Sequence, residues 1–208
     1  MKRAALFLII ALAAPAHAEP SFDAHMLAGA QYFQQGRYTD ALVEFRVAER
    51  LAGDGGPIWY VAATLVKLKR PEDALTEFAR AEVRAPADRD GLFDYYHALA
   101  CYDARLYSCA DRLLATIGDE PGPKIAAQAR KIRRDLAPVL TVPAPPSTID
   151  WYHARGQAAL RAGREALAAA YFEEAVGLAG PQPDAYRRAE ALTALAHARA
   201  SSAPESKR

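Results

Sequence analysis

Cys101, Cys109 and His97 are the residues whose types and spacing could carry chemistry in this chain. The two cysteines could form a disulfide, remain free thiols, or bind a metal ion together with the histidine. On one continuous helix their Cα atoms would lie about 12 Å apart, beyond the roughly 4.4–6.8 Å that a disulfide spans. A bridge therefore requires a turn between them. The Cys2His set lacks a fourth ligand at zinc-site spacing, so we expect no metal and no cofactor.

Catalytic signatures are absent from the sequence. It contains no G-x-S-x-G elbow, no H-E-x-x-H helix and no phosphate-binding glycine-rich loop with lysine. The acid pairs Glu72-Asp73 and Glu173-Glu174 lie near arginines in helical patterns, which is typical of a solvated helix surface. His25 and His153 occur singly, as packing or surface residues often do. We therefore expect a protein that is not an enzyme.

The N-terminus predicts export. Lys2-Arg3 precedes an apolar run from Ala4 to Ala14, and Ala16-His17-Ala18 follows as a small-x-small cleavage site. The run is shorter than the roughly 20 apolar residues that cross a bilayer. We therefore expect a signal peptide over residues 1–18, cleaved after Ala18. Arginine greatly outnumbers lysine and asparagine is absent, as in proteins of GC-rich bacteria, so the expected location is the periplasm.

The expected mature chain is close to neutral. The sequence has 26 basic and 25 acidic residues, and removal of Lys2 and Arg3 with the signal peptide would leave 24 and 25. Such a chain offers no general attraction to nucleic acid or to an anionic membrane surface. No later segment has the apolar length of a transmembrane helix. We expect neither nucleic-acid binding nor a transmembrane segment.

Small and aromatic residues recur at helical spacing, without the alternation that strands require. Two segments that start at His25 and Trp59 superimpose at a spacing of 34 residues. Glycine or proline breaks recur between the helical stretches. The recurring positions of the second helix are Ala41, Phe45 and Ala48 in one segment and Ala74, Phe78 and Ala81 in the other.

This pattern resembles the tetratricopeptide repeat (TPR), whose paired helices stack into a superhelix. The match is best from Trp59 to Pro86, good in the segment before it, weaker in the one after it, and recurs from Gly156 to Ala175. Small residues let the helices of a hairpin approach closely, and the aromatic fills the gap to the next hairpin. The resemblance implies an all-α fold: a TPR-like right-handed superhelix of antiparallel hairpins, with a Pro-rich interruption before a C-terminal hairpin plus helix.

The resemblance also gives the expected organisation after the signal peptide. Residues 19–137 would hold three hairpins and a basic capping helix, whose charge suits either an exposed helix face or an anionic partner. Residues 138–148 would be a Pro-rich linker, because proline prevents a partner helix from forming there. Residues 149–200 would form a hairpin and a final helix that docks on the main array, since such arrays need about three repeats. Residues 201–208 would be a disordered tail.

The resemblance to the tetratricopeptide repeat also implies how the two cysteines are arranged. It places the turn of the third hairpin near Asp103 to Arg105, which implies that Cys101 and Cys109 face each other across two helices. In an exported chain with an even number of cysteines, this favours a disulfide over two buried free thiols.

TPR proteins bind partners on the concave surface lined by the first helix of each hairpin. The aligned positions are apolar and aromatic, which suits a peptide or helix of another protein. We expect a non-catalytic scaffold or adaptor for another periplasmic or envelope protein. The alternatives are a self-associating structural module, a groove filled by the chain's own C-terminal helices, or an accessory factor of a cell-wall or secretion complex. The predicted groove residues are Met26, Phe33, Tyr60, Thr64, Lys67, Tyr95, Leu99 and Tyr102.

Overall fold

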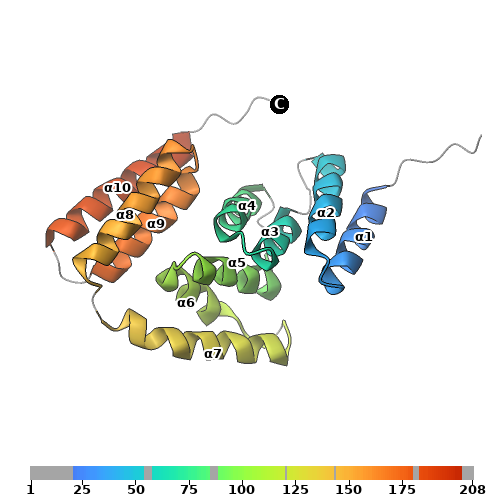
Figure 1. Ribbon diagram of the computed structural model, residues 1–208, viewed down its shortest axis with the longest axis horizontal. Coiled ribbons are helices and arrows are strands. Elements are labelled where there is room, and N and C mark those ends of the chain that lie inside the picture. Colours follow the sequence, from blue (N-terminus) through green and yellow to red (C-terminus); the bar gives the residue numbers. More distant parts are fainter. Residues whose placement is uncertain are drawn as a thin grey trace, which may run out of the picture.

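The computed structural model describes residues 21–53, 58–84, 89–119, 121–142, 144–179 and 183–202. The predicted signal peptide and residues 203–208 of the predicted tail lie outside them. Within the described ranges the chain forms helices and no strands, which confirms the all-α class. Helices that follow one another in the chain pack as adjacent pairs (Figure 1).

Three helical hairpins make up the first part of the fold. Within each hairpin the two helices pack on each other, and α2 on α3 and α4 on α5 join successive hairpins. The helices are α1 (Phe22–Gln34), α2 (Tyr38–Ala52), α3 (Ile58–Lys67), α4 (Pro71–Arg84), α5 (Gly91–Asp103) and α6 (Tyr107–Thr116).

The remaining helices form a cap and a separate unit. Helix α7 (Pro123–Leu140) packs on α6. Helices α8 (Pro146–Arg161), α9 (Glu165–Ala179) and α10 (Pro183–Ser202) pack on one another, and we call them the C-terminal unit. This unit lies on the opposite side of the array from α1 (Figure 1).

All four hairpins share one turn geometry. The turn residue has a left-handed backbone in each, with φ of 76° at Gly36, 58° at Lys69, 67° at Arg105 and 68° at Gly163. Its amide bonds to the carbonyl three residues earlier, and the next amide bonds to the carbonyl five residues earlier, as in a Schellman motif. The longer bonds join Arg37 to Tyr32, Arg70 to Leu65, Leu106 to Cys101 and Arg164 to Ala159. The hairpin α8–α9 is therefore built like the first three.

Close helix packing explains the small residues. A Cβ added to Gly29 would lie 2.6 Å from the buried ring of Phe45, and one added to Gly156 would overlap Phe172 in the same way. Real carbon atoms do not approach so closely, so only glycine fits beneath these rings. The glycine and the aromatic residue together set the distance between the helices of the first and fourth hairpins.

The interruption between the two parts is shorter than the sequence predicts. The capping helix, expected to end at Ala137, continues through Pro138 to Leu140. Leu136 is buried and Leu140 packs against the core, so apolar contacts on both sides of Pro138 compensate for its missing amide. Helix α8 starts at Pro146, where a first-turn proline has no hydrogen bond to lose.

The C-terminal end also departs from expectation. Helix α10 continues to Ser202, so the first two residues assigned to a disordered tail are helical.

Candidate functional site

The first helices of the three hairpins meet on one face. The rings of Phe33 on α1 and Tyr96 on α5 lie 6.0 Å apart in an edge-to-face arrangement. Between them, the Lys67 ammonium on α3 lies 5.5 Å from the centre of the Tyr96 ring. Tyr95 contacts Tyr96 at a centroid separation of 5.7 Å. We call this surface of α1, α3 and α5 the first-helix face.

The predicted groove residues differ in accessibility. Tyr102 is 40% exposed and Tyr60 36%, and Lys67 is also exposed. Tyr60 packs against the ring of Phe45 on α2. The half-buried members, which pack against the core, are Met26, Phe33, Tyr95 and Leu99.

Thr64 does not belong to the accessible face. Its side chain is completely buried, and its hydroxyl donates to the Tyr60 carbonyl oxygen at 2.7 Å. A threonine inside a helix can satisfy its hydroxyl in this way. Thr64 therefore packs the second hairpin internally, and its assignment to the groove was wrong.

Tyr96 is the residue of this face that sequence reasoning missed. Counted back from the turn residues Gly36, Lys69 and Arg105, it corresponds to Leu27 and Tyr60. From this position Tyr96 contacts Phe33 and Lys67. The predicted alignment paired Tyr60 with Tyr95, one residue short, because the turns at Lys69 and Arg105 lie 36 residues apart.

The C-terminal unit docks on the second helices of the array. Helix α9 packs against α4 and α6. Glu174 of α9, almost completely buried, accepts hydrogen bonds from the backbone amides of Ser108 at 2.8 Å and Cys109 at 3.3 Å. These amides belong to the first turn of α6, whose N-cap Leu106 offers no side-chain acceptor. Burial raises the pKa of Glu174, and the donated amides partly oppose this rise.

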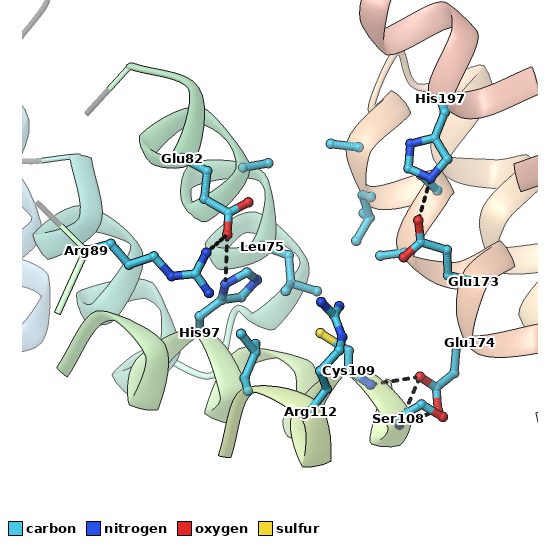
Figure 2. A pocket seen from close by; sticks show the side chains of 16 residues that line it. Leu75, Glu82, Arg89, His97, Ser108, Cys109, Arg112, Glu173, Glu174 and His197 are labelled. Carbon is cyan, nitrogen blue, oxygen red and sulfur yellow. Dashed lines mark hydrogen bonds and ion pairs between the residues drawn. The ribbon is translucent and has the colours of Figure 1, made fainter. Parts of the chain in front are cut away.

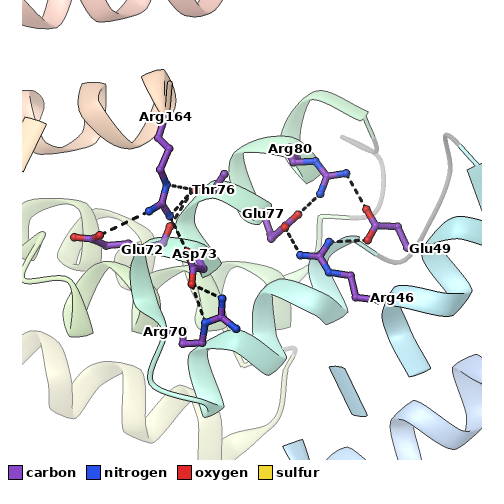
Figure 3. A network of polar contacts seen from close by, with 9 residues as sticks. All are labelled: Arg46, Glu49, Arg70, Glu72, Asp73, Thr76, Glu77, Arg80 and Arg164. Atoms are coloured by element: carbon purple, nitrogen blue, oxygen red, sulfur yellow. Dashed lines mark hydrogen bonds and ion pairs between the residues drawn. The ribbon is translucent and has the colours of Figure 1, made fainter. Parts of the chain in front are cut away.

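Further polar contacts fix the same interface. The Tyr152 hydroxyl donates to the Arg105 carbonyl at 2.6 Å, and the Tyr171 hydroxyl donates to Glu72 at 2.6 Å. Burial raises the pKa of Tyr171 to about 12. Arg164 reaches Asp73 and Thr76 at the start of α4 at 3.0 Å each (Figure 3). Among the helices of the array, α4 and α6 therefore make the main contacts with this unit.

Ion pairs also join the second helices of the first two hairpins. Arg46 and Glu49 on α2 alternate with Glu77 and Arg80 on α4 (Figure 3). Glu77 is 8% exposed, so its two arginine partners are needed to offset the loss of hydration. The network ties the first hairpin to the second on the side away from the first-helix face.

Cys101 and Cys109 lie across the third hairpin, as the repeat alignment implies. Their Cα atoms are 6.0 Å apart, and the structure joins the two residues in a disulfide. Cys101 is completely buried, whereas Cys109 lines a pocket. The turn at Arg105 brings them together, because on one helix they would be too distant.

His97 lies beside this disulfide. Its ring stacks on Phe78 with centroids 4.8 Å apart, and its Nδ1 lies 3.7 Å from Glu82 Oε1. Burial lowers the pKa of His97 to about 3, helped by the positive charges of Arg89 and Arg112. The imidazole is therefore neutral at physiological pH.

A pocket of about 530 Å³ separates this corner from the C-terminal unit. His97, Glu82 and Cys109 line one side, and Glu173 paired with His197 lines the other (Figure 2). Arginines and glutamates both line the wall, so its charge does not select an anion or a cation.

No protein-family model, curated protein or solved structure matches this chain.

The basic residues of the capping helix are largely paired. Arg133 of α7 reaches Asp111 of α6 at 2.9 Å, and Lys131 reaches Asp135 at 2.8 Å. Arg130 lies 3.4 Å from Asp119. These pairs reduce the attraction of α7 for an anionic partner.

Within the described ranges, the helices are too short or too polar to cross a membrane.

Proposed function

We propose that this protein is an exported, periplasmic tetratricopeptide-repeat scaffold that binds another envelope protein without catalysing a reaction. The hairpins would stack as a right-handed superhelix, with the first-helix face as its concave surface. The observation that carries the proposal is the docking of the C-terminal unit on α4 and α6. This docking argues against the alternative in which the chain's own C-terminal helices fill the groove.

The chemistry of the face favours a partner segment with large apolar side chains. Tyr102 and Tyr60 offer exposed ring surface, and Tyr95 and Leu99 extend it toward the core. Aromatic rings bury large area while losing little side-chain entropy. Lys67 adds one positive charge, so an amphipathic helix with an acidic residue would be complementary.

A cross-linking pull-down from periplasmic extract tests the proposal. The bait is the mature protein, compared with a variant that carries Tyr60→Ala, Tyr95→Ala and Tyr102→Ala. We expect the variant to lose the captured envelope protein. Val83→Ala is the matched control, because Val83 is an 83% exposed apolar residue on the second helix α4. Equal capture by the triple variant and the control would contradict the assignment of the binding surface.

Self-association is the second candidate. The first hairpin carries Leu27, Val43 and Leu51, each more than half exposed, and no earlier hairpin packs against it among the described residues. Apolar residues at the end of an array can pair with a second copy. Light scattering would then give a dimer mass that Leu27→Asp with Val43→Asp converts to a monomer mass.

A further inference from the structure

Three potential metal ligands converge in the third hairpin. One ligand atom each from His97, Cys101 and Cys109 lies within 4.8 Å of the others. A tetrahedral zinc site, with bonds of about 2.3 Å to sulfur and 2.0–2.1 Å to nitrogen, places its ligand atoms roughly 3.5–3.8 Å apart. In the disulfide the two sulfur atoms are bonded to each other, so reduction must separate them before the three atoms reach the spacing that zinc requires.

His97 interrupts the repeat at this position. Counted back from the turn residues Gly36, Lys69 and Arg105, it corresponds to Ala28 and Val61, which are apolar. The third hairpin also has Leu114 where Phe45 and Phe78 recur in the first two. An imidazole thus takes the place of an apolar packing residue beside the two cysteines.

The orientation of His97 suits metal binding. Phe78 holds the ring plane by stacking, and Glu82 lies 3.7 Å from Nδ1. The Nδ1 atom is buried and has no closer hydrogen-bond partner. A carboxylate that accepts a hydrogen bond from one ring nitrogen orients the other nitrogen toward a metal. At 3.7 Å Glu82 is beyond hydrogen-bond distance, so it must move closer to Nδ1 to act in this way. His97 lies between Glu82 and Cys109, so Nε2 is the nitrogen available as a ligand (Figure 2).

Access to the site differs between the two sulfur atoms. Cys109 and His97 line the pocket of about 530 Å³, whereas Cys101 is completely buried behind them. An ion could enter from the pocket, and a water molecule there could complete a tetrahedral coordination. Catalytic and exchangeable zinc sites share this arrangement of three protein ligands and one open position.

We propose that the third hairpin is a redox-gated zinc site. A dithiol reductant reduces the disulfide to two thiols and is itself oxidised to a disulfide, which balances two electrons and two protons. Zinc then binds Sγ of Cys101, Sγ of Cys109 and Nε2 of His97, and the two thiols release their protons. Thiol–disulfide exchange with another protein's disulfide reverses the reduction and expels the ion, because a disulfide sulfur lacks the thiolate charge.

Cobalt binding tests the site, since Co²⁺ replaces Zn²⁺ and reports thiolate ligands by visible absorption. The full mature protein, reduced with a phosphine and transferred to anaerobic buffer, should bind one Co²⁺ with thiolate-to-cobalt charge transfer. Added Zn²⁺ should displace it. The oxidised protein should show no such band and no alkylatable thiol.

Variants test which residues bind the metal and which only lie near it. Cys109→Ser should weaken the charge-transfer band, because Cys101 alone remains as a thiolate ligand, and His97→Ala should weaken Co²⁺ binding at least tenfold. Glu82→Gln should weaken it by about 10–100-fold while the thiolate band stays. His197→Ala, on the opposite wall of the pocket, is the matched control and should bind like the wild type. Circular dichroism checks that each reduced variant keeps its helices.

Three results would overturn the proposal. The reduced wild type could bind no Co²⁺ in excess. The reduced wild type could bind Co²⁺ with the same affinity as the reduced His97→Ala variant. This would mean that the two cysteines bind the metal without the histidine. The reduced chain could also lose its helices without Co²⁺ restoring them.

Discussion

At the residue scale, glycine beneath an aromatic ring sets the distance between two helices. Gly29→Ala would push a methyl group into Phe45, so we expect the free energy of unfolding to fall by about 1–3 kcal/mol. The double variant with Phe45→Leu should recover part of that loss, because the smaller side chain leaves room for the methyl. Urea unfolding followed by circular dichroism measures both. If Gly29→Ala had the same free energy of unfolding as the wild type, the two helices would be able to move apart without a loss of stability.

His97 should make the protein sensitive to acid. Its pKa falls from about 6.5 in the unfolded chain to about 3 in the folded protein, because burial and the positive charges of Arg89 and Arg112 disfavour the protonated imidazole. Below pH of about 6.5 the unfolded chain binds the extra proton, so stability should drop by about 1.4 kcal/mol per pH unit until about pH 3.

The variant His97→Phe keeps a ring on Phe78 but cannot titrate. Its stability should depend less on pH than that of the wild type when urea unfolding is measured from pH 7 to pH 4. Parallel pH profiles for the two proteins would rule out His97 as the acid-sensitive group.

Part of the candidate site could be predicted from the sequence. Phe33 and Lys67 were predicted from the repeat alignment, and the structure places both against Tyr96. Thr64 was misplaced because alignment gives the direction of a side chain but not whether its neighbours cover it. Tyr96 was missed because the alignment paired its neighbour Tyr95 with Tyr60, although the turns at Lys69 and Arg105 lie 36 residues apart.

At the element scale, the turns offer a direct test of the shared hairpin geometry. Lys69 has a left-handed backbone without being glycine, which is unfavourable for a residue with a Cβ. Lys69→Gly should therefore stabilise the protein by about 0.5–1 kcal/mol, after the greater flexibility of glycine in the unfolded chain is allowed for. Lys69→Ala loses the same exposed ion pair with Asp103 but keeps the Cβ, so it should not be stabilised. Denaturant midpoints that rank the two variants the other way would refute this.

The N-terminus of α6 should depend on a residue from the C-terminal unit. Glu174→Ala removes the acceptor for the Ser108 and Cys109 amides, so both amides should exchange hydrogen faster in a hydrogen-exchange experiment. Stability should fall by about 1–3 kcal/mol because buried donors lose their partner. Glu173→Ala is the matched control, since Glu173 is the exposed neighbour that pairs with His197. Equal exchange in both variants would mean that α9 does not cap α6.

Helix positions were more predictable than helix ends. Hydrophobic periodicity and glycine turns placed the hairpins, because both act over a few neighbouring residues. The end of α7 was misjudged at Pro138, since burial of Leu136 and packing of Leu140 extend the helix beyond a local breaking signal. Tertiary contacts of this kind leave no short-range pattern in the sequence.

At the scale of the whole molecule, the position of the C-terminal unit decides which surface is open. Docking was expected from the small size of the unit, but its site on α4 and α6 was not. The contacts that fix it join residues far apart in sequence, such as Glu174 with Ser108 and Arg164 with Asp73. No repeat pattern encodes such pairs. The resulting arrangement leaves the first-helix face as the proposed binding surface.

Site-specific photocross-linking identifies which surface of the protein contacts its partner. A photoreactive phenylalanine analogue at Tyr102, on the first-helix face, is compared with the same analogue at Val83 on α4 during expression in the periplasm. We predict a cross-link to one envelope protein from position 102 that is absent from position 83 and is lost when Tyr60→Ala and Tyr95→Ala are added. Cross-links to that protein from position 83 alone, or only to the chain itself from position 102, would contradict the account.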